Sequence, residues 1–406
     1  MFAVSSSIPS RALLRPRTGA LRNKKIDMPG HPPSSILHPR RILVRGVNWL
    51  GDAVMTTPAL MRLREKFPAA HITLLTHEKL LDVYLHHPAL DEIITFSKGD
   101  GVFALGRRLR AGKFDLALVL PNSPRSAMES WLARIPRRVG GTWPWRNWFL
   151  TDAIPSRTGA VKMHKRTESE VRELTSAAPS PLASRLSPSS HHIHQYLHLV
   201  AALGADGSAL PPMLAVTDEE ITTAKRKFGL EKVSAPIFAL NPGAEYGPAK
   251  RWPTEKFIAA AREIQTRTNC HWLILGGKAD IQTAEAIASS IFHPPSSILN
   301  VSGQTSLREL MALLKLSRVL LTNDTGPMHV AAALGTPVVV PFGSTSPELT
   351  GPGLPGDPRH RLLKSDAPCS PCFLRECPID FRCMNGISVE RVVESVLDVV
   401  KIPALL

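Results

Sequence analysis

Two successive series of short apolar runs, each separated by segments of helical periodicity, constrain the fold most. The first series includes residues 41–46 (RILVRG), 71–76 (HITLLT), 92–96 (EIITF) and 114–122 (FDLALVLPN). The second opens at 236–243 (PIFALNPG) and continues to 336–343 (TPVVVPFG). Near-continuous apolar strands that alternate with helices indicate parallel sheets covered on both faces. We therefore predict two doubly wound, Rossmann-like α/β domains facing a central cleft, with ligands outside the carboxyl ends of the strands.

The chain divides into four predicted parts. Residues 1–40 are a basic, low-complexity head that we expect to be disordered, residues 41–205 form the first domain, residues 206–387 the second, and residues 388–406 a C-terminal helix. A Ser/Pro/His-rich stretch at about 176–193 is interpreted as a loop insertion. The heptapeptide HPPSSIL occurs at 31–37 and again at 293–299, and we interpret both copies as inserted sequence without a chemical role.

The charge balance favours anionic partners but identifies none of them. The formal net charge is +15 and the pI about 9.9, although part of the excess lies in the head. No apolar run approaches the roughly 20 residues of a membrane span. The head also lacks the continuous apolar core of a signal peptide. We therefore expect a cytoplasmic protein.

The stretch 46–60 (GVNWLGDAVMTTPAL) follows the first apolar run and resembles a phosphate-binding loop. It has the order of strand, glycine turn and helix, with Gly46 and Gly51. The next residue, Asp52, is an anion where a phosphate would sit. One interpretation is that Asp52 caps the following helix, and the other is that it is functional. A helix that begins at Thr57 would leave Asp52 free.

The second domain carries the clearest features for binding an anion. In 241–253 (NPGAEYGPAKRWP), Asn241 and Gly243 belong to a strand exit, and Lys250 and Arg251 precede a helix. Two cations near a helix N-terminus suit a diphosphate, although they are also typical of a solvated loop. The spacing is not that of a Walker loop.

A second strand exit in this domain, 322–326 (TNDTG), also opens a helix. Asp324 either caps that helix or faces the cleft. In the second case Thr325, Gly326 and His329 surround the helix N-terminus, where a phosphate would meet backbone N–H groups and a sugar hydroxyl would meet the acid. At the exit 275–280 (LGGKAD), Lys278 and Asp280 are candidates for contacts with a nucleoside.

Four of the five cysteines, Cys369, Cys372, Cys377 and Cys383, lie close together in the sequence. In a reducing compartment they indicate either a structural zinc site or four reduced thiols that pin a loop. The stretch 140–150 (GGTWPWRNWFL) holds three tryptophans beside Arg146. It indicates either a membrane-interfacial patch or an apolar loop packed on the domain.

These motifs together resemble glycosyltransferase family 9, the heptosyltransferases of lipopolysaccharide synthesis. The resemblance rests on GDAVMTTPAL, NPGAEYGPAKRWP, NDTGPMHVAAALGTPVVVPFGSTSPELTGP and CSPCFLRECP, and it extends from residue 41 to the final helix. It implies a GT-B fold with an acceptor-binding first domain and a nucleotide-sugar-binding second domain. Within the family, the segment 243–253 (GAEYGPAKRWP) is most similar to the type II enzymes. A type I enzyme or another member is the alternative.

The resemblance implies inverting transfer of L-glycero-D-manno-heptose from ADP-heptose to a heptose of the lipopolysaccharide inner core. It assigns Asp52 as general base, Lys250 to the donor phosphates or sugar, and Asp324, Thr325 and Gly326 to the turn around the donor. An inverting displacement agrees with this division, because base and diphosphate must occupy different walls of the cleft. The further expected donor contacts are Asn241, Gly243, Arg251, Lys278, Asp280 and His329, and the expected acceptor contacts are Asn122, Arg125 and Arg146, with Arg137 and Arg138 nearby.

With cations of its own, such a site needs no obligatory metal or other cofactor, and a zinc at the cysteines would be structural. We expect a monomer that associates transiently with the cytoplasmic face of the inner membrane and binds no nucleic acid. A nucleotide-sugar epimerase on the same fold is one alternative, but it needs no separate acceptor pocket. A basic, four-cysteine nucleic-acid-binding protein is another, but it predicts basic residues interleaved with aromatics along one face.

Overall fold

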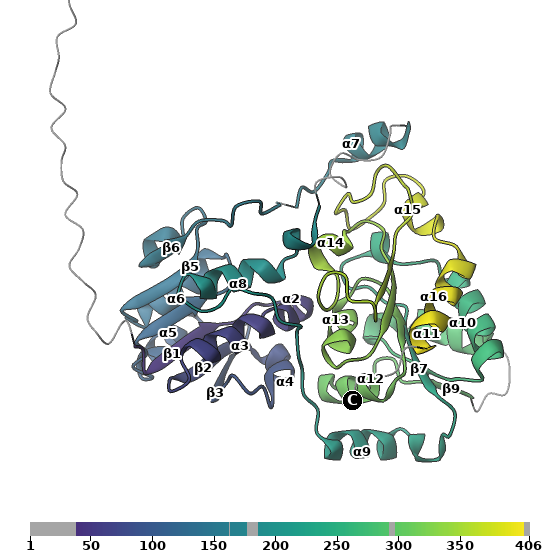
Figure 1. The fold of residues 1–406 in the computed structure, drawn as a ribbon, viewed down its shortest axis with the longest axis horizontal. Helices are drawn as coiled ribbons and strands as arrows, with labels where there is room; N and C mark the ends of the chain where they lie inside the picture. The colour runs from purple at the N-terminus through teal and green to yellow at the C-terminus, as the bar shows by residue number, and fades with distance from the viewer. Residues whose placement is uncertain (1–37, 162, 177–185, 292–296, 402–406) are drawn as a thin grey trace, which may run out of the picture.

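The computed structural model describes residues 38–161, 163–176, 186–291 and 297–401, which form two lobes side by side (Figure 1). Each lobe contains a parallel six-stranded sheet. The first sheet has the order β3-β2-β1-β4-β5-β6 and the second the order β12-β11-β10-β7-β8-β9. The strands of the first are β1 (Arg41–Arg45), β2 (His71–His77), β3 (Glu92–Phe96), β4 (Leu116–Val119), β5 (Arg137–Gly141) and β6 (Asp152–Ile154). Those of the second are β7 (Ile237–Asn241), β8 (His271–Ile274), β9 (Ile298–Asn300), β10 (Leu320–Thr322), β11 (Val338–Pro341) and β12 (Arg361–Leu363).

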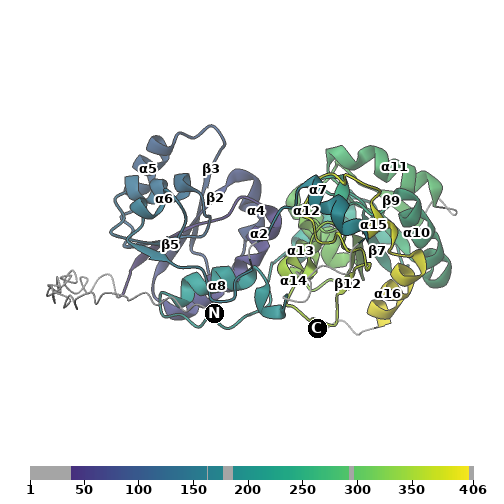
Figure 2. The same ribbon diagram turned by 90° about the horizontal axis from the view of Figure 1, so that it is seen from above.

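Helices accompany both sheets (Figure 2). The helices up to residue 201 are α2 (Leu50–Met55), α3 (Thr57–Lys66), α4 (Leu81–Tyr84), α5 (Val102–Arg110), α6 (Pro124–Leu132), α7 (Glu168–Glu173) and α8 (Ile193–Ala201). The later ones are α9 (Asp218–Lys227), α10 (Thr254–Thr268), α11 (Ile281–Ser290), α12 (Leu307–Leu316), α13 (Gly326–Ala333), α14 (Pro347–Thr350), α15 (Arg382–Asn385) and α16 (Val389–Lys401). The predicted pair of doubly wound α/β domains is confirmed.

In each sheet the strand order reverses at the first strand of that domain: the chain first adds strands on one side of it and then on the other. Strand β1 pairs with β2 on one side and β4 on the other, and β7 pairs with β8 and β10. Every residue of β7 is buried, as the near-continuous apolar runs predict. Such reversal points are where doubly wound sheets bind ligands, at the carboxyl ends of the strands. The segments after β1, β4, β7 and β10 therefore define the candidate site.

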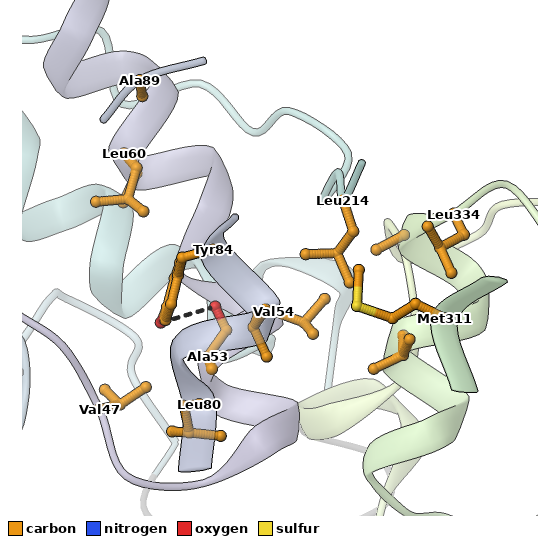
Figure 3. Packing of buried hydrophobic residues seen from close by; sticks show 14 of the residues in the cluster. Val47, Ala53, Val54, Leu60, Leu80, Tyr84, Ala89, Leu214, Met311 and Leu334 are labelled. Atoms are coloured by element: carbon orange, nitrogen blue, oxygen red, sulfur yellow. Dashed lines mark hydrogen bonds between the residues drawn. The ribbon is translucent and has the colours of Figure 1, made fainter. Parts of the chain in front are cut away.

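Helices α2 and α13 hold the two domains against each other. A continuous apolar cluster runs from α2 through Leu214 to Met311 and Leu334 (Figure 3). Two glycines make the helix contact close: a Cβ on Gly51 would lie 2.7 Å from Cδ2 of His329, and one on Gly326 would lie 2.7 Å from Cδ2 of Leu50. A larger residue at either position would require the facing side chain or helix to shift.

Two segments lie where sequence patterns alone would not place them. Helix α7 falls within the range assigned to the first domain, yet its Val171 packs against Cys369 and Cys372 of the second. Arg166 ties this excursion down, since its backbone N–H donates to the Cys372 carbonyl. Helix α16 packs against α10 in the core of the second domain.

Several predictions concern residues outside the described ranges. These include nearly all of the head, the first copy of HPPSSIL, part of the second copy, and residues 177–185 of the Ser/Pro/His-rich stretch. Within the part of the chain that the structure describes, no helix is long and apolar enough to cross a bilayer.

Candidate active site

Asp52 lies in the first turn of α2, directly after the exit of β1. It is not the helix cap, because the N-cap position is Trp49, which makes no side-chain cap hydrogen bond. A second helix, α3, does begin at Thr57, as expected, but its N-cap position is Thr56, and the Thr57 hydroxyl donates to the carbonyl of Val54. The Asp52 carboxylate is therefore free of any capping role, and its Oδ1 accepts a hydrogen bond from the Tyr196 hydroxyl of α8 at 3.3 Å.

The surroundings of Asp52 suit a general base. Burial raises the pKa of Asp52 above its usual range, while the Tyr196 hydrogen bond and the charge of Lys250 lower it. A carboxyl group with a raised pKa is a stronger proton acceptor once ionised. Lys250, the smallest of these three influences, belongs to the other domain.

Tyr196→Phe tests that environment. The change removes a hydrogen bond that lowers the pKa of Asp52, so the pKa rises further and the base is protonated over a wider acidic range. We expect the acidic limb of the pH profile of kcat/KM to move to higher pH, with the plateau largely retained. An unmoved limb would show that this limb does not report Asp52.

Asp52 borders a cavity of about 580 Å³ in the first domain. Residues at or after the ends of β1, β4, β5 and β6 line it, and it is closed by Gln195 and Tyr196 of α8 and by His192, which precedes that helix. Among the described residues that line the cavity, Asp52 is the one carboxylate. A hydroxyl-bearing molecule held there would have a single carboxylate base within reach.

In the second domain, three neighbouring strand exits bring Lys250, Asp324 and Thr345 together. The Nζ of Lys250, on the 3₁₀ turn Pro248–Lys250, lies 2.7 Å from Oδ2 of Asp324. The hydroxyl of Thr345 donates to the same oxygen at 2.5 Å. Asp324 makes no cap hydrogen bond with α13, whose N-cap is Thr325. Its carboxylate holds the lysine, so the capping interpretation is wrong.

Asn323, which the sequence analysis did not single out, joins the exits of β7 and β10. Its side-chain Oδ1 accepts from the backbone N–H of Trp252 at 2.9 Å, and its Nδ2 donates to the Pro242 carbonyl at 2.7 Å. Asn323 is fully buried. It therefore fixes the loop of Lys250 relative to the turn of Asp324. Its position in the sequence, directly before the candidate acid Asp324 at a strand exit, is the feature that could have identified it.

His329 lies between the two domains, on the first turn of α13. Burial lowers the pKa of His329 to about 4, against a smaller opposing effect of Asp324. The imidazole is therefore neutral at physiological pH and can act as a hydrogen-bond partner but not as a cation. Gly326 and Thr325 lie at the N-terminus of the same helix, where free backbone N–H groups favour an anion.

The remaining predicted donor residues fall into two groups. Asn241 is buried, and its Nδ2 donates to the Thr322 hydroxyl at 3.1 Å, so it joins β7 to β10. Arg251, Lys278 and Asp280 lie further out. The Nη2 of Arg251 is 3.9 Å from Oδ1 of Asp280, and Lys278 is exposed. Gly243 makes room for Asp280, because a Cβ there would lie 2.3 Å from the carboxyl group.

The predicted acceptor residues also separate. Arg146 is fully buried, its Nη1 donates to Oδ1 of Asn122 at 3.1 Å, and its Nε and Nη2 have no hydrogen-bond partner. Burial lowers the pKa of Arg146 to about 10. Asn122 lines the cavity and so links this guanidinium to it.

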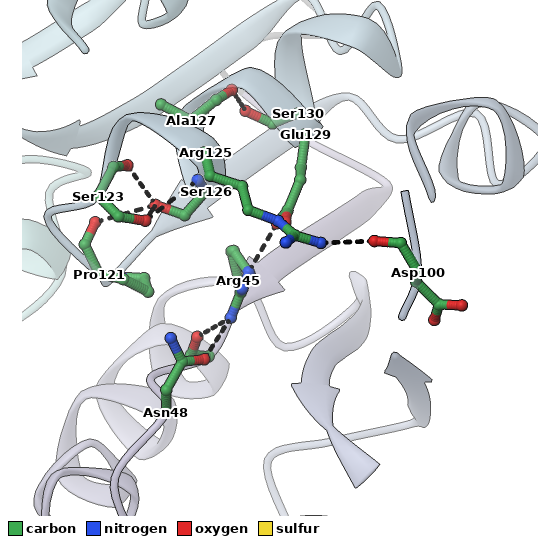
Figure 4. Close-up of polar contacts among 11 residues, drawn as sticks. Arg45, Asn48, Asp100, Pro121, Ser123, Arg125, Ser126, Ala127, Glu129 and Ser130 are labelled. Atoms are coloured by element: carbon green, nitrogen blue, oxygen red, sulfur yellow. Dashed lines mark hydrogen bonds and ion pairs between the residues drawn. The ribbon is translucent and has the colours of Figure 1, made fainter. Parts of the chain in front are cut away.

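Arg125 does not line the cavity. Its Nε donates to Glu129 at 3.1 Å and its Nη2 to the carbonyl of Asp100 (Figure 4). Buried Glu129 also pairs with Arg45 at 2.8 Å, so the three side chains form one network. Arg137 is likewise occupied, by Asp152 at 2.8 Å. The sequence shows arginines near a strand exit but not which carboxylates engage them.

The cysteine-rich segment, residues 369–383, supports the lysine turn. The backbone N–H of Ala249 donates to the Arg375 carbonyl at 3.0 Å, and the Tyr246 hydroxyl donates to the Phe373 carbonyl at 2.8 Å. All four of its cysteines are free thiols, and burial raises the pKa of Cys383 to about 12. No group of three or more His, Cys, Asp or Glu residues among the described residues is arranged to hold a metal ion.

Comparison with known proteins points to one family. Residues 102–381 match the family model of Glycosyltransferase family 9 (heptosyltransferase). The chain is 31% identical over 324 residues to lipooligosaccharide heptosyltransferase 2 of Haemophilus ducreyi, covering 77% of this chain and 86% of that protein. It is 30% identical to lipopolysaccharide heptosyltransferase 2 of Escherichia coli K12, covering 77% and 85%.

Solved structures agree. The structure superimposes on E. coli ADP-heptose LPS heptosyltransferase II with a TM-score of 0.70 at 25% identity, covering 89% of this chain and 98% of the other. A family 9 glycosyltransferase of Veillonella parvula gives a TM-score of 0.72 at 23% identity, with 89% and 97% covered. The expected GT-B arrangement of two Rossmann-like domains is confirmed.

Proposed function

Because the chain belongs to glycosyltransferase family 9, the heptosyltransferases, we propose that it transfers L-glycero-D-manno-heptose from ADP-heptose to a heptose of the lipopolysaccharide inner core, with inversion. One observation carries this proposal: Asp52 borders a cavity in the first domain, while Lys250 is held by Asp324 at the strand exits of the second. Base and leaving-group cation thus belong to opposite walls, as an inverting displacement requires.

In this mechanism, the acceptor hydroxyl lies in the cavity of the first domain and gives its proton to Asp52. The acceptor oxygen forms a bond to the anomeric carbon as the bond from that carbon to the phosphate oxygen breaks. The electron pair leaves with ADP, where Lys250 and the N-terminus of α13 stabilise the developing charge. Neutral His329 is available as a hydrogen-bond donor beside the same helix terminus.

The acceptor side holds a buried cation behind the cavity wall. Arg146 has two unpartnered nitrogens, and buried guanidinium groups are normally paired with an anion. Its contact with Asn122 connects it to the cavity that Asp52 borders. We assign Asn122 to acceptor binding on this basis, Arg146 to holding Asn122 in place from behind, and Arg125 to support of the cavity through Glu129.

A transfer assay with defined acceptors tests the function. ADP-heptose is offered with monoheptosylated and with unheptosylated core acceptor, and product mass is measured. We expect addition of one heptose to the monoheptosylated acceptor. Preference for the unheptosylated acceptor would indicate a type I enzyme. Absence of transfer combined with tight, salt-dependent binding of generic DNA would favour the nucleic-acid-binding alternative.

We propose that the reaction is independent of divalent metal, because Lys250 and the terminus of α13 supply the positive charge at the leaving group. Transfer by the full-length enzyme, expected to be a monomer, should be unchanged after treatment with a chelator and after addition of Mg²⁺. Turnover that disappears with chelator and returns with Mg²⁺ would refute this. Elemental analysis of protein purified without added zinc tests the cysteine-rich segment separately.

We also propose that the first domain touches the cytoplasmic face of the inner membrane. Trp145 and Trp148 are 84% and 87% exposed, and Trp131 and Trp143 are about half exposed. The nearby helices α5 and α6 add exposed arginines, whereas acidic Glu129 is buried in an ion pair. Exposed tryptophans with surrounding cations favour an anionic membrane surface.

Replacing Trp145 and Trp148 with alanine tests this contact. We expect less of the protein to sediment with vesicles that contain anionic lipid, because the variant loses the apolar side-chain area that inserts into the membrane surface. Transfer to a short, water-soluble acceptor should remain, since neither residue lines the cavity. Unchanged vesicle binding, or an equal loss of transfer to the soluble acceptor, would contradict the assignment.

A further inference from the structure

Thr345 lies on the loop after β11, beside the turn that holds Asp324. Strands β11, β10 and β7 are neighbours in the sheet, so Thr345, Asp324 and Lys250 occupy three successive strand exits. Thr345 is 7% exposed and Asp324 is 4% exposed. Because both side chains are buried, their hydrogen bond is shielded from competition by water.

One carboxylate oxygen of Asp324 receives both contacts. Oδ2 accepts from the Thr345 hydroxyl at 2.5 Å and from the Lys250 ammonium at 2.7 Å. The two donors come from opposite neighbouring strands and therefore fix the rotation of the carboxylate from two sides. Without the hydroxyl, the carboxylate is free to turn about its χ2 torsion, which is broad for Asp, and the ammonium turns with it.

One segment of the chain holds both ends of this row of three side chains, Thr345, Asp324 and Lys250. Backbone N–H groups of Cys372 and Phe373 donate to the carbonyl of Ser344, next to Thr345, at 3.1 and 2.7 Å. The same segment holds the turn of Lys250 through the carbonyl of Arg375. The Lys250 ammonium also lies 4.9 Å from the centre of the Tyr246 ring. Both ends of the row are thus clamped by residues 372–375.

We propose that Thr345 is a positioning residue that fixes the Lys250 ammonium through Asp324, an inference that rests on the proposed role of Lys250 at the donor diphosphate. The threonine does not touch the leaving group. It sets the direction in which the lysine presents its remaining N–H donors, and preorganised charge of this kind stabilises a transition state more than a ground state. Loss of the hydroxyl should therefore lower kcat more than it raises the KM for ADP-heptose.

Thr345→Val and Thr345→Ser test the proposal in the full-length enzyme. Valine keeps the shape and removes the hydroxyl, whereas serine keeps the hydroxyl. We expect kcat to fall about 10- to 100-fold in Thr345→Val, the usual range for a hydrogen bond to a charged group, and to recover most of its value in Thr345→Ser. Thr350→Val is the matched control. Thr350 ends α14, and its hydroxyl donates to the backbone carbonyl of Ser346, so the change should leave kcat near that of the unmodified enzyme.

A double-substitution cycle separates positioning from a general loss of structure. If Thr345 acts through Asp324, then Thr345→Val should cost little more in an Asp324→Asn background. The proposal would be overturned if the losses of kcat from Thr345→Val and Asp324→Asn multiply in the double variant. It would also be overturned if Thr345→Val leaves kcat unchanged, or if Thr345→Ser is as impaired as Thr345→Val. An unimpaired Lys250→Met enzyme would instead overturn the proposed function of the lysine, whatever the Thr345 variants do.

Discussion

Asp52→Asn is expected to lower kcat by about 10²–10⁴-fold, the range for loss of a positioned general base. Asparagine matches the size of the carboxylate and keeps an oxygen for the Tyr196 hydroxyl, but it accepts no proton from the acceptor. Affinity for ADP should change little, because the donor contacts lie in the other domain. Initial rates with saturating ADP-heptose and calorimetric titration with ADP measure the two quantities.

Stability provides the control for Asp52→Asn. Since burial raises the folded-state pKa of Asp52, its protonated form stabilises the fold below the ordinary carboxyl pKa. That contribution is lost as the pH rises through the raised pKa. The neutral asparagine does not carry this cost, so its Tm at neutral pH should equal or exceed that of the unmodified protein. An active Asp52→Asn enzyme would refute the base assignment, whereas an unfolded one would show a structural role.

The acid limb gives an independent check on Asp52. The general base must be ionised, so kcat/KM should fall as the pH drops through the pKa of Asp52, at a higher pH than an unperturbed aspartate would give. Asp52→Asn should abolish this limb along with most of the activity, whereas Tyr196→Phe should only move it.

The candidate site residues that local sequence predicts are those at strand exits. Asp52, Lys250 and Asp324 each follow an apolar run that the structure shows as a buried parallel strand, and such strands place their exits at one edge of a sheet. The same reasoning would have included Thr345, since 342–346 follows β11 just as Asp324 follows β10. A hydroxyl at a strand exit is a weaker signal than a charged residue, because Ser and Thr are also common in turns that bind nothing.

Contacts between distant segments were beyond sequence reasoning. The donor to Asp52 is Tyr196, which lies 144 residues later on α8. Arg125 is predicted to meet the acceptor, but even an exposed arginine pairs with a carboxylate that folds beside it, here Glu129. The packing of α7 on the cysteine-rich segment is similar, because it depends on where the chain crosses between domains and not on helical pattern.

Lys250→Met is the second change with a large expected effect, a loss of about 10²–10³-fold in kcat/KM, as for removal of one donor that stabilises a developing anion. Methionine keeps much of the side-chain length and its packing over Tyr246 but carries no charge. Two consequences combine. The diphosphate loses a cation as it departs, and Asp324, 4% exposed, loses its ion-pair partner. Steady-state kinetics with ADP-heptose give kcat and KM separately.

Matched variants separate these two consequences. Arg251→Met removes a neighbouring cation whose side chain is 42% exposed and whose Nη2 is as far as 3.9 Å from Oδ1 of Asp280. An exposed, loosely paired cation contributes little, so we expect a much smaller loss of kcat/KM. Combining Lys250→Met with Asp324→Asn removes the unpaired buried carboxylate, and so should restore Tm without restoring kcat. Recovery of kcat in the double variant would mean that Lys250 serves only to neutralise Asp324. The leaving-group charge would then fall to the N-terminus of α13, where Thr325 and Gly326 present backbone N–H groups.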